Sequence, residues 1–98
     1  MPSAPTTIER PETELDTDEV LDVPWNVTVF DDPVNLMRYV TMVLMRVFGH
    51  QRQRAETMML AIHKKGKCIV WSGERERAEL YVQQLHSHQL RATMARAE

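Results

Sequence analysis

Two adjacent carboxylates and one imidazole are the side chains of this sequence with the clearest capacity for chemistry. Asp31 and Asp32 stand directly before Pro33, and His63 lies in a later apolar segment that ends in two lysines. Ionised carboxylates only accept hydrogen bonds, so the pair could hold a cation rich in donors. Taken alone, such aspartates are most often a turn before a helix, and a histidine near a helix end is usually a capping or interface residue. A catalytic carboxylate pair is disfavoured because side chains of neighbouring residues tend to point apart.

Metal and disulfide chemistry are not expected from this sequence. Cys68 is the one cysteine, so it has no partner for a disulfide within the chain, and a cytoplasmic location is expected. His86 and His88 are two residues apart on a predicted helix and would face different sides of it. The sequence also lacks an HExxH motif. We therefore predict no metal and no other cofactor.

Charge divides the chain into two parts. Residues 1–22 hold seven acidic residues against one basic residue, Arg10, together with three prolines. This segment has few large apolar side chains, so their burial cannot offset the entropy lost when the segment becomes ordered. We predict a flexible acidic arm over residues 1–22 and one folded domain over residues 23–98. No secretory signal is predicted, and no membrane span, because the longest apolar run, VTMVLM, is short and bounded by arginines.

Hydrophobic periodicity predicts six elements in the folded part. Alternation indicates a strand over 25–30, and apolar residues three and four apart indicate helices over 36–48 and 51–63. Residues 67–72 are typical of a strand, a third helix follows, and 90–94 can form an edge strand. The order β-α-α-β-α-β predicts an α+β fold, a small sandwich in which three helices cover one face of a three-stranded antiparallel sheet.

Short polar side chains at two boundaries predict helix caps. Asn35 precedes the first apolar helix and Ser72 precedes the third, and both residue types are favoured at the N-cap. Glu74 and Glu76 would then lie in the first turn of the third helix, where the helix dipole favours negative charge. The predicted inner face of this helix holds Ala78, Tyr81, Val82 and Leu85.

Three separated segments of the folded part carry a resemblance to a known family. They are DDPVNLMRYVTMVLMRVFG, AETMMLAIHKKGKCIV and the late AEL…L…LRATM. Together they resemble the ClpS family, in what looks like its actinobacterial form, over residues 25–94. The resemblance implies the fold order derived above and an adaptor with no enzymatic activity. It implies that the protein binds N-degrons, which are free, bulky apolar N-terminal residues (Leu, Phe, Tyr or Trp). The captured substrates would be delivered to the N-terminal domain of a ClpC or ClpA unfoldase for degradation by a Clp protease.

The resemblance also implies which residues form the binding site. The α-amine of the substrate would be held by Asp31, Asp32 and His63. The apolar side chain would enter a pocket formed by Asn35, Met37, Val40, Met59, Ile62 and Leu90. Docking on the unfoldase would involve Glu76 and Tyr81. Asp31 stands where many family members have asparagine, and Tyr81 stands where a basic residue is common.

The chemistry of these residue types fits a site that binds a chain terminus. An α-amine has a pKa of about 7.7 to 8.0, so at neutral pH it is mostly a cation with three donors. An internal leucine lacks this cation, and an N-terminal serine lacks the apolar side chain, so each leaves half of the site unpaired. Unbranched methionines suit the pocket because they can repack around aliphatic or aromatic guests.

A basic cluster supports one alternative. Its members are Lys64, Lys65, Lys67, Arg75 and Arg77. They could belong to a small α+β module that binds RNA or a ribosomal partner, although no glycine-rich clamp or pair of stacking aromatics accompanies them. The favoured prediction is a monomer that binds N-degron proteins and a Clp unfoldase, without nucleic acid or membrane.

Overall fold

The computed structural model describes residues 23–97, and the predicted acidic arm over residues 1–22 lies outside them. The predicted order β-α-α-β-α-β and the three-stranded antiparallel sheet are confirmed. The elements are β1 (Trp25–Phe30), α2 (Met37–Phe48), α3 (Arg52–Lys65), β2 (Lys67–Gly73), α4 (Arg75–Ser87) and β3 (Arg91–Arg96).

The sheet places its first strand in the centre. The strand order is β2-β1-β3, and both pairings are antiparallel, so β3 is an edge strand as predicted. β1 pairs Phe30 with Lys67 of β2 and with Arg91 of β3. The β1–β2 register shifts between Val27 and Thr28, where β2 carries one extra residue. Such a bulge bends a strand and increases its local twist.

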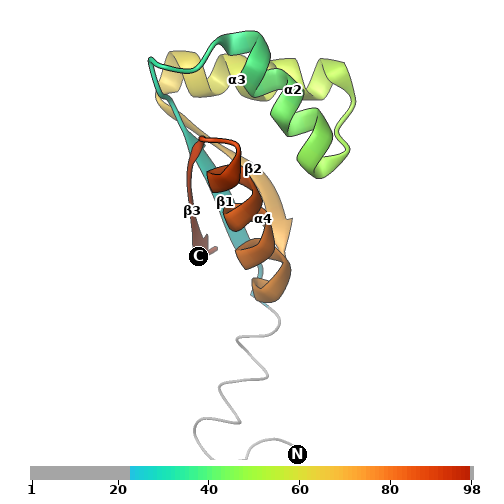
Figure 1. Cartoon of the computed structure of the whole chain (residues 1–98). Coiled ribbons are helices and arrows are strands. Elements are labelled where there is room, and N and C mark those ends of the chain that lie inside the picture. The colour runs from blue at the N-terminus through green and yellow to red at the C-terminus, as the bar shows by residue number, and fades with distance from the viewer. Residues whose placement is uncertain (1–22, 98) are drawn as a thin grey trace, which may run out of the picture.

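The core forms where the sheet meets the helices. α4 runs along the sheet, whereas α2 and α3 lie together near the end where β1 finishes (Figure 1). The alternation of β1 is confirmed, since Val27 and Val29 are buried. The strands and the helices contribute side chains to the same core. Leu44 of α2 and Leu85 of α4 belong to it, and neither has exposed surface.

Glycines end α2 and α3, as the sequence predicts. Gly49 and Gly66 adopt φ values of 75° and 91°, in the left-handed region that side chains with a Cβ rarely enter. The Gly66 N–H donates to the Ile62 carbonyl oxygen at 2.9 Å, which satisfies one carbonyl of the last turn. The chain therefore turns sharply from α3 into β2.

Both predicted N-caps are wrong. The N-cap position of α2 is Leu36, and the Asn35 amide instead donates to the carbonyl oxygen of Gln89, 3.0 Å away. Ser72 lies inside β2, where its hydroxyl bonds the Asn26 side chain on the neighbouring strand, and Glu74 is the N-cap residue of α4. In both cases the side chain bonds a partner on a distant segment in place of the nearby backbone.

Candidate functional site

A cavity of about 280 Å³ opens where β1 ends, α2 begins, α3 ends and the chain enters β3. All nine residues predicted for the substrate amine and its pocket line this cavity: Asp31, Asp32, Asn35, Met37, Val40, Met59, Ile62, His63 and Leu90. Val29, Phe30 and Pro33 line it too. Segments far apart in the sequence therefore meet in one concave site.

The backbone of Asp31 is held from two sides. Its N–H donates to the Gly66 carbonyl oxygen at 2.9 Å, which ties the end of β1 to the end of α3. Its carbonyl oxygen accepts a 3.2 Å hydrogen bond from the Arg91 guanidinium, which also lies over the Phe30 ring at 5.9 Å. These contacts leave the half-buried Asp31 carboxylate on a fixed stretch of backbone.

Asp32 forms the turn that its residue type suggests. Its Oδ1 accepts a hydrogen bond from the Val34 N–H at 2.9 Å, and its carbonyl oxygen accepts one from the Asn35 N–H at 3.1 Å. A turn and a binding role are compatible here, because a carboxylate has acceptor capacity beyond one bond. The two adjacent carboxylates place negative charge at one end of the cavity.

The last turns of α3 supply the opposite side. Met59, Ile62 and His63 are three and four residues apart, so they share one face of this helix. His63 lies in the last turn, with an exposed side chain that lines the cavity beside the aspartate loop. The helix thus presents two apolar side chains and a polar ring to the same cavity.

The apolar wall combines buried and exposed side chains. Ile62 and Leu90 are 3% and 4% exposed, so their positions are set by core packing. Met37 is 41% exposed, one turn before Val40 on α2. A buried base beside an exposed, unbranched methionine suits side chains of different shape, because a thioether side chain can repack around them.

Two hydrogen bonds hold the loop that carries Leu90. The Tyr39 hydroxyl donates to the His88 carbonyl oxygen at 2.8 Å, and Asn35 donates to the next carbonyl, that of Gln89. Gln89 has a φ of 70°, an uncommon conformation for a residue with a Cβ. The start of α2 therefore positions the turn between α4 and β3, and with it one wall of the cavity.

The two residues predicted for unfoldase docking lie on α4, outside this cavity. Glu76 is exposed in the first turn, whereas Tyr81 is half-buried. The Tyr81 ring lies 4.6 Å from the Phe48 ring, and its hydroxyl accepts a hydrogen bond from Arg77 at 2.9 Å. Tyr81 is thus anchored in the fold, and Arg77, one turn earlier on α4, places a positive charge beside its hydroxyl.

Sequence reasoning missed the residues that hold the site in place. Arg91, Tyr39 and Gln89 act through contacts with residues about fifty or more positions away. The pairing of Phe30 with Arg91 in the sheet would have identified Arg91, but that register emerges only from the folded structure. No local pattern marks the other two.

Within residues 23–97, none of the helices combines the length and apolar character needed to span a bilayer.

The family described as "ATP-dependent Clp protease adaptor protein ClpS" matches residues 21–93. The ClpS adapter protein of Corynebacterium efficiens is 46% identical over 98 residues, covering 98% of this chain and 95% of its own. That of Rhodococcus opacus is 42% identical over 96 residues, covering 98% and 86%.

The solved structure of Agrobacterium tumefaciens ClpS2 bound to L-phenylalaninamide has the same fold, with a TM-score of 0.72 and 22% identity. The match covers 76% of this chain and 98% of that one. The chain belongs to the ClpS family and is an adaptor of the ATP-dependent Clp protease. This membership does not favour the alternative of an RNA-binding module.

Proposed function

We propose that this adaptor captures substrate proteins by a free N-terminal Leu, Phe, Tyr or Trp and delivers them to a Clp unfoldase for degradation. Asp31, Asp32 and His63 hold the α-amine of the substrate, and the apolar residues of the cavity hold its first side chain. The adaptor domain comprises residues 23–98. It acts in the cytoplasm as a monomer, without a cofactor or catalytic chemistry of its own.

One observation carries the proposal: carboxylates and an apolar wall line the same small cavity. Its volume of about 280 Å³ lies just below the usual range of about 300 to 1,000 Å³ for small-molecule sites, which suits one side chain and its terminus. The ligand of the Agrobacterium tumefaciens relative, L-phenylalaninamide, joins a free α-amine to an aromatic side chain. Such a ligand matches both halves of the cavity described above.

Both halves of the site are needed for useful affinity. A hydrogen bond to a charged group contributes about 1.5 to 3 kcal/mol, and burial of a Leu or Phe side chain contributes about 1.5 to 3 kcal/mol. Micromolar binding needs about 8 kcal/mol, so neither contribution is sufficient alone. Binding therefore requires a free terminus and a bulky apolar residue together.

Delivery uses a different surface. The N-terminal domain of a ClpC or ClpA unfoldase docks on α4 at Glu76 and Tyr81, with Arg77 beside them supplying a positive charge. The acidic residues 1–22 are the segment that the unfoldase engages during delivery. Substrate capture and unfoldase docking thus occupy separate faces of the domain.

The first experiment compares two fluorescent peptides that differ only in acetylation of an N-terminal leucine. Fluorescence anisotropy should show micromolar or tighter binding of the free peptide alone. Binding should decline as the pH rises above about 8, because the α-amine then loses its charge. Equal binding of both peptides, or no binding of free Leu, Phe, Tyr and Trp peptides, would refute the proposal.

Two variants that each remove one negative charge separate capture from delivery. Asp32→Asn should abolish peptide binding while keeping an oxygen to accept from the Val34 N–H. Glu76→Gln, on the exposed surface of α4, should leave peptide binding intact and weaken binding to the unfoldase N-terminal domain. Loss of peptide binding in both variants would point to a general charge effect and contradict the assigned site.

A further inference from the structure

Methionine sulfur forms part of the wall of the cavity at the end of β1. Met37 of α2 and Met59 of α3 line this cavity beside Ile62 and Leu90, which are almost completely buried. The apolar, polarizable thioether suits such a wall. Peroxides, however, convert it to a polar sulfoxide, a common oxidative change in proteins. The wall therefore contains a group whose polarity can be changed by a chemical reaction.

Solvent exposure distinguishes Met37 from the other methionines. Met37 has 41% of its surface exposed, whereas Met59 is half-buried. Among the methionines within residues 23–97, Met42 has a similar exposure of 36%, and Met58 belongs to the core at 9%. An oxidant dissolved in water has to reach the sulfur atom, so Met37 and Met42 should react first and Met58 last.

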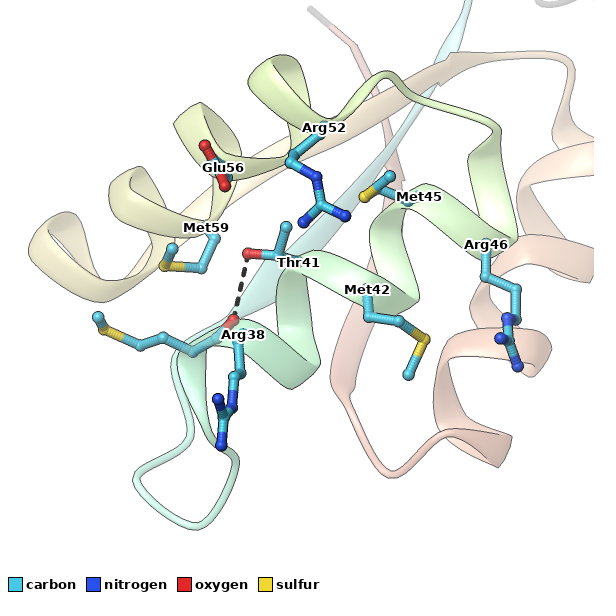
Figure 2. Close-up of a pocket in the computed structure, with 9 residues that line it drawn as sticks. Arg38, Thr41, Met42, Met45, Arg46, Arg52, Glu56 and Met59 are labelled. Atoms are coloured by element: carbon cyan, nitrogen blue, oxygen red, sulfur yellow. Dashed lines mark hydrogen bonds between the residues drawn. The ribbon is translucent and has the colours of Figure 1, made fainter.

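Met42 provides a matched comparison for Met37. A second cavity, of about 470 Å³, lies between α2 and α3, and Met42 lines this one but not the cavity at the end of β1. Met59 points from α3 toward α2, whereas Met42 projects from α2 on the side away from Met59 (Figure 2). Met37 and Met42 thus share residue type, helix and exposure, but only Met37 lines the proposed N-degron site.

A sulfoxide at Met37 would place a polar oxygen in the apolar half of that site. A leucine or phenylalanine side chain that packs against this wall displaces water from the oxygen, and Ile62 and Leu90 have no side-chain donor to replace it. An unpaired polar group of this kind weakens binding by about five- to hundredfold. We expect about five- to tenfold, the lower part of this range, because Met37 keeps part of its surface in water.

We propose that Met37 is an oxidation site at which hydrogen peroxide lowers the affinity of the adaptor for N-degrons. This inference rests on the proposed function, because the affinity that changes is that of the cavity at the end of β1. A lone pair of the Met37 sulfur attacks one peroxide oxygen, so an S–O bond forms and the O–O bond breaks. The second oxygen takes the proton of the transferred oxygen and leaves as water. The sulfur is oxidised by two electrons, and the peroxide is reduced.

The test treats the full chain with hydrogen peroxide and makes two measurements on each sample. Peptide mass spectrometry gives the fraction of sulfoxide at each methionine, and fluorescence anisotropy gives the affinity for a free-leucine peptide. The reaction is quenched when Met37 and Met42 are oxidised and Met58 is not. The affinity should fall by about five- to tenfold in proportion to the fraction of Met37 oxidised, with an unchanged circular dichroism spectrum.

Two matched substitutions assign the loss to one sulfur atom. Met37→Leu removes the proposed target, Met42→Leu removes the comparison residue, and each variant is compared with its own untreated sample. Peroxide should leave the affinity of Met37→Leu unchanged and should lower that of Met42→Leu as much as that of the wild-type chain. Cys68 is present in all three chains, so oxidation of its thiol cannot produce this difference.

Reversal provides a measurement that needs no variant. Treatment of the oxidised wild-type chain with methionine sulfoxide reductases should restore the Met37 thioether and the affinity together. If Met37 resists oxidation, if its oxidation leaves the affinity unchanged, or if Met37→Leu is as sensitive as the wild-type chain, the inference is refuted and the proposed function stands. If the untreated chain binds no free-leucine peptide, the proposed function fails, and this inference fails with it.

Discussion

The hydrogen bond from Tyr39 to the His88 carbonyl gives the most quantitative test of how the cavity is held together. It is 2.8 Å long, partly buried, and joins α2 to the end of α4. Tyr39→Phe deletes its donor without changing the shape of the ring. A neutral hydrogen bond contributes about 1 kcal/mol net, so we expect the free energy of unfolding to fall by about that amount.

The expected thermal shift follows from the size of the domain. Unfolding entropy is about 2.1 cal/mol/K per residue, so over residues 23–97 a loss of about 1 kcal/mol lowers Tm by about 6 °C. Calorimetry measures the Tm, and urea titration measures the free energy of unfolding. Free-leucine peptide affinity should fall only slightly, since Asn35 still holds Gln89.

Tyr81→Phe is the matched control for this experiment. It removes the same atom from an exposed hydrogen bond with Arg77, where water replaces the lost partner, so Tm should change by less than about 2 °C. Equal shifts in the two variants, or no shift in Tyr39→Phe, would refute the conclusion that the contact between α2 and α4 stabilises the loop before Leu90.

Three further predictions concern the fold. Gly66→Ala should cost about 1 kcal/mol through its φ of 91° alone, because nothing lies within 4 Å of the added Cβ, and the urea midpoint should fall at unchanged m. Leu44→Ala should cost about 3 kcal/mol by leaving a cavity in the core, and a loss below about 1 kcal/mol in urea titration would contradict its complete burial. Burial raises the pKa of the Cys68 thiol, partly offset by Lys65, so alkylation by iodoacetamide at pH 8 should be slower in the folded than in the urea-unfolded protein. For the same reason the contribution of Cys68 to stability is present at neutral pH and declines as the pH rises through its folded pKa, and equal alkylation rates would argue against this.

The fold was predictable where local pattern and tertiary structure agree. Alternation over Trp25–Phe30 placed Val27 and Val29 in the core because a strand between two neighbours has one face against the helices. The glycines that end α2 and α3 followed from conformational preference alone. Asn35 and Ser72 were misjudged because their partners, Gln89 and Asn26, lie on distant segments that only folding brings close.

The candidate site was predictable mainly through family resemblance. From residue types alone, Asp31 and Asp32 indicate a turn, and Asp32 does form one with Val34. The two aspartates line the same cavity as Leu90 because β1 and β3 pair in register. The cavity between α2 and α3 could not be predicted, because helical periodicity does not specify how these two helices pack against each other.

The central position of β1 has a consequence for how the protein is made. β1 pairs along its whole length with β3, from Trp25 with Arg96 to Phe30 with Arg91. Such distant contacts form late, since the loop between them must close before any pairing stabilises it. A growing chain on the ribosome therefore carries Asp31 and Asp32 long before Leu90 exists to complete the cavity. The cavity is therefore complete only once synthesis has passed β3, and an unfinished copy lacks the wall that Leu90 supplies.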